Sequence, residues 1–248
     1  MRAIGIIPAR YESRRFPGKP LADIHGTTLI QRVYDQAKKC SVLDEVVVAT
    51  DDKRILDHVL RFGKAVMTNP DHPSGTDRCL EAYELLNSNK RFNDNDLLVN
   101  IQGDQPFIAP EQIAVVVEAF KHQDVSIATL ATSIKNQEDM KQSDVVKVVC
   151  DKNGRALYFS RSPIPFCRNK DSYGSVALPG MKHIGIYGFR ISTLKQLCRL
   201  PLGNLEQSEG LEQLRWLENG FKVWVKETAI DRISIDRREN IFQSGETS

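Results

Sequence analysis

Short apolar segments alternate with helical segments through the first half of the chain, and this alternation constrains the fold more than any other feature. Residues 4–7, 45–50, 65–67 and 97–101 are apolar or β-branched runs typical of buried strands. Between the first two runs, apolar residues recur at helical spacing from Leu29 to Ala37. The order predicts an α/β fold with a mostly parallel, right-handed wound sheet and helices packed on it.

The second half of the chain has a mixed pattern instead of a strict alternation. Strand-like runs at 126–130, 145–149, 156–160 and 183–189 follow one another, and residues 206–219 predict a helix that Gly220 ends. We find no repeat, low-complexity tract or linker. The sequence therefore predicts one globular unit over residues 1–248, with a parallel half at 1–124 and a mixed half at 125–248.

Composition excludes several classes of protein. The 34 Lys and Arg residues nearly cancel the 32 Asp and Glu residues, so bulk charge points to neither nucleic acid nor a membrane surface. No apolar run approaches ~18 residues and no signal peptide pattern opens the chain, so we expect neither membrane insertion nor export. The five cysteines never form C-x-x-C, which is typical of reduced thiols in a cytoplasmic protein.

A basic loop follows the first predicted strand. Four cations, Arg10, Arg14, Arg15 and Lys19, stand among Pro and Gly residues directly after the apolar run. The carboxyl end of a parallel strand is where an open α/β sheet binds ligands. Because neither standard phosphate-loop spacing is present, we expect the side chains of this loop to hold phosphates. A solvated basic loop is the alternative, and the position after a buried strand argues against it.

A carboxylate follows the predicted strand at 97–101, where the chain reads Gln102-Gly103-Asp104. A carboxylate at a strand tip facing a basic loop suits Mg²⁺, which is held by one or two carboxylates together with phosphate oxygens and water. We therefore predict that Asp104 is a metal ligand. A plain turn is the alternative, and the polar Gln102 beside the tip favours the functional interpretation.

Seven segments together resemble one enzyme family. They are residues 6–21, 49–52, 74–78, 102–104, 156–161, 182–187 and 211–215. The opening segment alone is typical of all sugar nucleotidyltransferases, whereas the last three resemble the 3-deoxy-manno-octulosonate (Kdo) cytidylyltransferases, the CMP-Kdo synthetases of Gram-negative bacteria. The resemblance extends over nearly the whole chain.

The resemblance implies a reaction and an assembly. It implies a Rossmann-related, nucleotidyltransferase-like fold that transfers CMP from CTP to the anomeric hydroxyl of Kdo, releases pyrophosphate and serves lipopolysaccharide biosynthesis. The enzyme would depend on Mg²⁺ and act as a cytoplasmic homodimer. Residues 1–124 would bind CTP, and residues 125–248 would hold the sugar site and the dimer interface.

The resemblance also implies roles for individual residues. The catalytic set would be Arg10, Lys19, Asp104 and Asp236, with Asp104 and Asp236 as the metal ligands. The nucleotide would be bound by Pro8, Ala9, Arg10, Arg15, Lys19, Ser74, Gly75, Arg78 and Gly103. The sugar would be bound by Gln102, Arg161, His183, Tyr187, Glu212 and Gln213, with the planar fork of Arg161 on its carboxylate.

Two departures from the family pattern leave alternatives open. Asp236 is followed by Arg237 and Arg238 where the family has Thr-Pro, and Gln105 stands where it more often has Glu. Either change could accompany another sugar acid, such as 8-amino-Kdo or sialic acid. A catalytically silent nucleotide-binding module is a further alternative, and the presence of Asp104, Lys19 and Arg10 argues against it.

Overall fold

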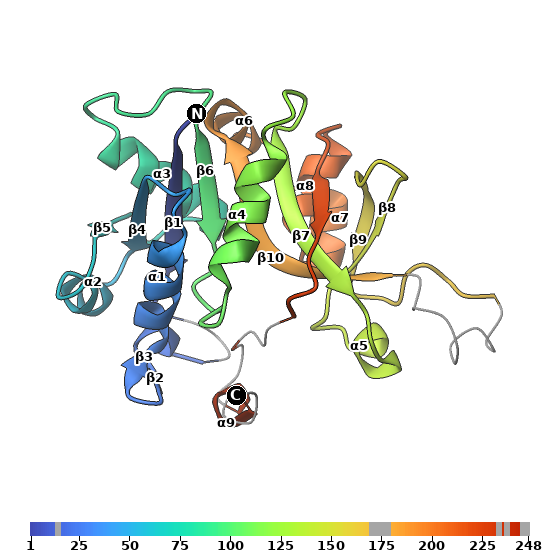
Figure 1. Ribbon diagram of the computed structural model, residues 1–248, viewed down its shortest axis with the longest axis horizontal. Coiled ribbons are helices and arrows are strands. Elements are labelled where there is room, and N and C mark those ends of the chain that lie inside the picture. The colour runs from blue at the N-terminus through green and yellow to red at the C-terminus, as the bar shows by residue number, and fades with distance from the viewer. Residues whose placement is uncertain (13–15, 169–179, 232–234, 236–238, 244–248) are drawn as a thin grey trace.

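In the part of the chain that the structure describes, a nine-stranded sheet carries helices on both faces (Figure 1), and residues 23–28 form a separate two-stranded hairpin. The structure is a computed structural model that describes residues 1–12, 16–168, 180–231, 235 and 239–243. Seven of the nine strands follow the order β11-β7-β10-β6-β1-β4-β5, and β8 and β9 extend the sheet from β10. Within the described ranges, no helix is both long and apolar enough to cross a membrane.

The elements have the following bounds. The strands are β1 (Ala3–Ala9), β2 (Asp23–Ile24), β3 (Thr27–Thr28), β4 (Glu45–Thr50), β5 (Ala65–Met67), β6 (Leu97–Ile101), β7 (Ile127–Ser133), β8 (Lys147–Cys150), β9 (Ala156–Ser160), β10 (Met181–Arg190) and β11 (Trp224–Glu227). The helices are the 3₁₀ helix η1 (Lys19–Leu21), α1 (Leu29–Lys39), α2 (Lys53–Val59), α3 (Gly75–Leu86), α4 (Pro110–Ala119), α5 (Gln137–Lys141), α6 (Ile191–Leu197), α7 (Asn204–Glu209), α8 (Gln213–Glu218) and α9 (Asn240–Gln243).

The first half of the chain forms the predicted parallel sheet. Strand β1 pairs in parallel with β4 on one side and with β6 on the other, and β4 pairs in parallel with β5. The carboxyl ends of β1, β4 and β6 therefore meet at one edge, which lies at the bottom of Figure 1. This edge is where the sequence predicts the basic loop and Asp104.

Strand β10 inserts between the two halves and runs against its neighbours. It pairs antiparallel with β6 along Ile186–Arg190 and antiparallel with β7, with a shift of register between Ile184 and Tyr187. Strands β8 and β9 form an antiparallel extension, and β11 pairs in parallel with β7. The mixed second half that the sequence predicts is therefore confirmed.

The core has two layers, one on each face of the sheet. Apolar side chains of α1, α2 and α4 pack on one face, and those of α3, α6 and α8 pack on the other. Figure 1 shows α1 and α4 in front of the sheet, with α3 and α6 behind it. Helix α1 buries Leu29, Ile30, Val33, Tyr34 and Ala37, the face that its helical spacing predicts.

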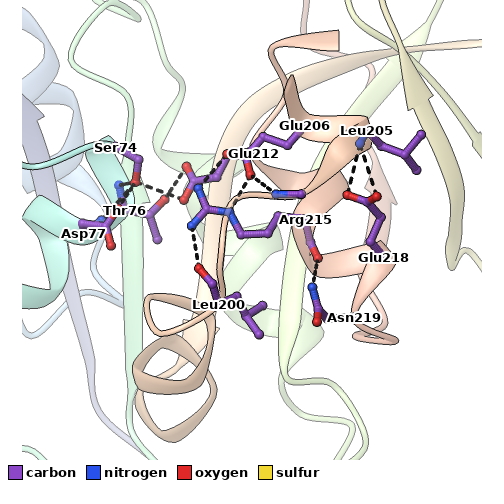
Figure 2. Close-up of polar contacts among 11 residues, drawn as sticks. Ser74, Thr76, Asp77, Leu200, Leu205, Glu206, Glu212, Arg215, Glu218 and Asn219 are labelled. Carbon is purple, nitrogen blue, oxygen red and sulfur yellow. Dashed lines mark hydrogen bonds and ion pairs between the residues drawn. The ribbon is translucent and has the colours of Figure 1, made fainter. Parts of the chain in front are cut away.

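The prediction of one helix over residues 206–219 is wrong. Helix α7 ends at Glu209, and Gly210 adopts a left-handed conformation with a φ of 62° that stops it. Helix α8 then begins at Gln213. An ion pair buried between the two helices joins them, with Arg215 Nη2 2.6 Å from Glu206 Oε1 (Figure 2). Breaks of this kind at a glycine are hidden in the sequence, because its helical periodicity continues across Gly210.

We predict that Glu206→Gln destabilises the protein by about 3–5 kcal/mol, because it leaves the buried Arg215 guanidinium without a counter-charge. Chemical denaturation measures this change in the free energy of unfolding. Lys53→Met is the control, since Lys53 pairs with Asp57 on the surface, with 78% of its side chain exposed. An equally small effect of both substitutions would contradict a structural role for the Glu206–Arg215 pair.

Candidate active site

Three of the predicted nucleotide-binding segments meet at Pro8, near the carboxyl end of β1. A Cβ atom on Gly103 would lie 2.7 Å from the carbonyl oxygen of Pro8, and one on Gly75 would lie 3.3 Å from its ring. Both positions thus admit little more than a hydrogen atom where the backbones approach. The end of β1, the start of α3 and the tip of β6 therefore form one edge, with Ala9 buried beneath it.

A cation and a carboxylate face each other at this edge. Lys19 Nζ lies 3.1 Å from Asp104 Oδ2, and the two side chains are 11% and 31% exposed. Gly18, with a φ of 71°, directs the loop into η1 and brings Lys19 beneath the tip of β6. The expectation that Asp104 faces the basic loop is confirmed. Arg10 is exposed beside it, and Arg15 lies outside the described residues.

The C-terminal segment also reaches this edge. The backbone N–H of Ile235 donates to the carbonyl oxygen of Asp104 at 2.9 Å, and Ile235 is fully buried. Asp236, the predicted second metal ligand, is the next residue in the chain and lies outside the described residues. In the part of the chain that the structure describes, no three His, Cys, Asp or Glu residues gather as a metal site.

Glu212 joins the start of α3 to the region around α8. Its Oε1 lies within hydrogen-bonding distance of Ser74 Oγ, at 3.0 Å, and its Oε2 accepts a hydrogen bond from Thr76 Oγ1 at 2.9 Å (Figure 2). Ser74 also caps α3, where its Oγ accepts from the backbone N–H groups of Thr76 and Asp77. Both oxygens of Glu212, a residue predicted to contact the sugar, are therefore engaged by residues at the start of α3.

Burial raises the pKa of Glu212 to about 7, and this effect exceeds the opposing effect of the hydrogen bonds from Thr76 and Ser74. The hydrogen-bond geometry also favours a raised pKa for Glu212. Ser74 Oγ lies 2.6 Å from Asp77 Oδ2 as well as 3.0 Å from Glu212 Oε1, but a hydroxyl has one proton and can donate to only one carboxylate. A proton on Glu212 removes the repulsion that the second contact would cause.

Arg78 connects α3 to two loops at the edge of the sheet. Its side chain is buried, and it donates to Asp51 Oδ2 and to Thr68 Oγ1, each at 2.6 Å. These contacts tie α3 to the ends of β4 and β5. The predicted role of Arg78 near the nucleotide therefore includes fixing the loop that carries Ser74 and Gly75.

His183 and Tyr187 lie on one face of β10, with their ring centroids 5.3 Å apart. Burial lowers the pKa of His183 to about 3, so its imidazole is neutral at physiological pH. Thr129 Oγ1 donates to the carbonyl oxygen of Ile186 at 2.7 Å and so accepts from His183 Nε2 at 2.9 Å. This arrangement places the proton on Nε2 and leaves Nδ1 as an acceptor.

Sequence reasoning missed Asn100. It is the register partner of Tyr187 on β6 and is 1% exposed. Among the described residues, neither its Oδ1 nor the Tyr187 hydroxyl, which lies near Thr129, makes a hydrogen bond. Two buried polar atoms without partners on adjacent strands fit a ligand or water that would satisfy both. The signal in the sequence was an amide inside the otherwise apolar run at 97–101.

Two other predicted sugar residues lie in different parts of the fold, Gln102 after β6 and Gln213 in α8. Gln102 lies against Gly185, where a Cβ atom would be 3.5 Å from Gln102 Cγ, and Gln105 lies beside it. Gln213 is buried at the start of α8. Gln102 is therefore the predicted sugar residue that adjoins the irregular stretch of β10.

Arg161 follows the last residue of β9, and backbone carbonyl groups hold its guanidinium. Nε donates to Glu209 at 2.7 Å, Nη1 to Ser143 at 3.0 Å and Nη2 to Gly210 at 3.4 Å. A guanidinium has five N–H groups, so two remain. Within the described residues, no carboxylate forms an ion pair with Arg161, and its charge is therefore available to an anion.

We predict that Glu212→Gln changes how stability depends on pH. In the folded protein the Glu212 pKa rises from 4.5 to about 7, so the folded state binds this proton more tightly than the unfolded chain does. The free energy of unfolding should therefore fall as pH rises between these values, by up to about 3 kcal/mol. Glu212→Gln should lose this fall and be more stable than the parent at pH 8, with little difference near pH 4.

Denaturation at a series of pH values checks this prediction. Glu218→Gln, on the exposed side of α8, is the control and should follow the parent protein. A parallel pH dependence of the parent and Glu212→Gln would show that Glu212 is ionised in the folded protein at neutral pH.

Comparison with known proteins identifies the family. The family model for cytidylyltransferases matches residues 4–230. A 3-deoxy-manno-octulosonate cytidylyltransferase of Thermodesulfovibrio yellowstonii is 49% identical over 97% of this chain and 96% of that protein. An 8-amino-3,8-dideoxy-manno-octulosonate cytidylyltransferase of Shewanella putrefaciens is 46% identical over 98% of this chain and 97% of that protein.

A solved structure agrees with these relatives. The chain resembles a CMP:2-keto-3-deoxy-manno-octonic acid synthetase complexed with CTP, with a TM-score of 0.88 and 39% identity over 98% of this chain and 96% of that one. Both the sequence and the fold thus match over nearly the full length. The chain belongs to the cytidylyltransferase family and, within it, to the 3-deoxy-manno-octulosonate cytidylyltransferases.

Proposed function

We propose that this protein transfers CMP from CTP to the anomeric hydroxyl of Kdo, forming CMP-Kdo and pyrophosphate for lipopolysaccharide biosynthesis. The observation that carries the proposal is the Lys19–Asp104 pair at the edge where Pro8, Gly75 and Gly103 meet. A cation and a carboxylate at the carboxyl ends of β1 and β6 suit a nucleoside triphosphate with its metal. The likeness to a synthetase complexed with CTP supports the same ligand.

The reaction needs placement and charge more than covalent help from the protein. The sugar hydroxyl oxygen forms a bond to the α-phosphorus of CTP, the bond from that phosphorus to the pyrophosphate oxygen breaks, and the hydroxyl proton is lost. Negative charge grows on the departing pyrophosphate. Arg10 and Lys19 can neutralise it at the edge of the sheet, which lowers the barrier without a protein nucleophile.

We propose that Asp104 and Asp236 hold Mg²⁺. The residues fit this ion for two reasons. The Asp104 carboxylate is partly exposed. The backbone of Ile235, the residue before Asp236 in the chain, is hydrogen-bonded to the backbone of Asp104. Few protein ligands are needed, since Mg²⁺ keeps waters and binds substrate phosphates. When bound, the ion supplies Lewis-acid stabilisation of charge on the phosphoryl oxygens.

The sugar-acid site extends from Arg161 to Tyr187. The free N–H groups of Arg161 suit a carboxylate, and the neutral His183 offers Nδ1 as an acceptor for a sugar hydroxyl. The unpartnered oxygens of Tyr187 and Asn100 offer further contacts between them. Gln102, Glu212 and Gln213 border this region, and Glu212 contacts Ser74 and Thr76.

We propose that the enzyme works as a homodimer in the cytoplasm. Phe166 is 89% exposed and Leu157 is 63% exposed, and both belong to the second half of the chain, where large apolar side chains favour a protein interface. All five cysteines are free thiols, which suits a reducing compartment. Light scattering after size-exclusion chromatography measures the dimer.

Pyrophosphate release tests the reaction. We predict release from CTP and Kdo together with Mg²⁺, and none when either substrate is left out. Faster turnover with 8-amino-Kdo would identify the variant sugar, which the Shewanella relative makes a specific alternative. Binding of CTP without release of pyrophosphate in the presence of any sugar acid would instead identify a silent nucleotide-binding module.

We predict that Asp104→Asn abolishes Mg²⁺-dependent turnover in a protein that remains folded. The substitution removes a charge from the metal site and should cost several kcal/mol of transition-state stabilisation, or about 10²-fold or more in kcat. Circular dichroism checks the fold, and Asp57→Asn on the surface of α2 is the matched control. Turnover near that of the parent at limiting Mg²⁺ would exclude Asp104 from the metal site.

We predict that Arg161→Lys raises the Michaelis constant for Kdo far more than that for CTP. A point charge cannot replace the planar fork on a carboxylate, and losing one charge-assisted hydrogen bond costs about 1.5–3 kcal/mol. Steady-state kinetics with each substrate varied in turn give the two constants. An equal rise in both would mean that Arg161 does not bind the sugar.

A further inference from the structure

Lys147, the first residue of β8, is a fully buried cation. Its Nζ donates to the carbonyl oxygens of Gln142 at 2.9 Å, of Val145 at 2.6 Å and of Arg161. An ammonium group has three donors, so these carbonyl groups use all of them. Among the described residues, no carboxylate forms an ion pair with Lys147.

A buried ammonium group of this kind fixes geometry more than it adds stability. Burial lowers the pKa of Lys147, with the charge of Arg161 acting in the same direction and that of Glu209 opposing both. An apolar side chain of similar volume often serves stability as well or better at a buried position. The specific result of the charge is that three separate carbonyl groups converge on one point.

The Lys147 ammonium group, where these carbonyl groups converge, is next to the backbone of Arg161. Lys147 binds the carbonyl group of Arg161 itself, and it binds both ends of the 142–145 loop whose Ser143 carbonyl accepts from Arg161 Nη1. Lys147 therefore constrains the guanidinium by two routes, one through the backbone and one through the loop. Both segments adjoin the β8–β9 extension on the right of Figure 1.

Glu209 constrains the same residue from the opposite side. Its Oε2 accepts from the backbone N–H of Arg161 at 2.9 Å, and its Oε1 accepts from Ser160 Oγ at 2.6 Å. The backbone N–H and C=O groups of Arg161 are thus each bound by a charged side chain. The side chain is left with its two unused N–H groups, and Lys147 contacts Arg161 only through its backbone carbonyl group.

We propose that Lys147 is a positioning residue for recognition of the sugar carboxylate, and that it acts by fixing Arg161. The proposal rests on the proposed function of Arg161. A carboxylate that binds a planar fork requires the fork in one orientation, so a small displacement of Arg161 weakens binding of the acidic sugar and leaves the nucleotide site unchanged.

Lys147→Met tests the proposal. We expect the Michaelis constant for Kdo to rise about tenfold, with that for CTP within about twofold of the parent. Lys147→Gln keeps part of the hydrogen bonding and should show a smaller rise of the same kind if the Met variant fails to fold. Leu197→Ala, which truncates a buried side chain at the end of α6, is a control for lost stability and should leave the ratio of the two constants unchanged.

The decisive readout combines two substitutions. If Lys147 acts through Arg161, Lys147→Met should change the constant for Kdo by less than about twofold in an Arg161→Lys background. Additive effects, or an equal rise in the constants for both substrates, would overturn the proposal. If the single variant Arg161→Lys raises the constants for both substrates equally, the proposed function of Arg161 fails. If Arg161→Lys raises the constant for Kdo but the Lys147 variants behave like the parent, only the positioning role of Lys147 fails.

Discussion

Strand β10 is the element on which the rest of the structure depends. It pairs with β6 from the first half of the chain, and with β7 and β8 from the second half. Because these ladders share one strand, the nucleotide edge and the region of Arg161 are held in a single sheet. The register shift between Ile184 and Tyr187 lies within the ladder that β10 forms with β7, and Gly185 in this stretch adjoins Gln102 and Gln105 at the tip of β6. Bulges of this kind direct side chains at sites.

The charges of the site fall into two groups that differ in how they are satisfied. At the edge formed by β1 and β6, Lys19 faces Asp104 directly, and under the proposed function both would exchange partners for phosphate and Mg²⁺. Around Arg161 and Lys147 only carbonyl groups are hydrogen-bonded to the cations, so positive charge persists there without a direct counter-ion in the described part of the chain. The first arrangement suits a ligand that brings its own cation, and the second suits a carboxylate.

Much of the fold could be predicted because its signals are local. Continuous apolar runs predict β1, β4 and β6, and helical spacing predicts α1, since burial selects for both patterns. The break at Gly210 could not be predicted, because the apolar periodicity on both sides of it is compatible with one helix. The insertion of β10 between β6 and β7 depends on pairing between distant segments, which no local pattern records.

The candidate site could be predicted where a residue type stands in an unusual local context. Asp104 at a strand tip and the cations after β1 are such cases, and their contact through Lys19 agrees with the prediction. Lys147 and Glu209 escaped notice because a lysine or a glutamate in a polar segment is ordinary, and only the folded chain shows that both bind Arg161. The family resemblance predicts a sugar contact for Glu212, but its contacts with Ser74 and Thr76 depend on tertiary packing that no local pattern records.

The central claim is that the edge with Lys19 and Asp104 binds the triphosphate. The most direct test is a calorimetric measurement of CTP binding to Lys19→Met, in the presence of Mg²⁺ and without sugar. Loss of a charge-assisted contact to phosphate predicts a fall in affinity of about tenfold or more. Lys64→Met, which removes an exposed ion pair with Glu45, should bind CTP like the parent. An affinity of Lys19→Met within about twofold of the parent, in a protein with unchanged thermal stability, would contradict the account.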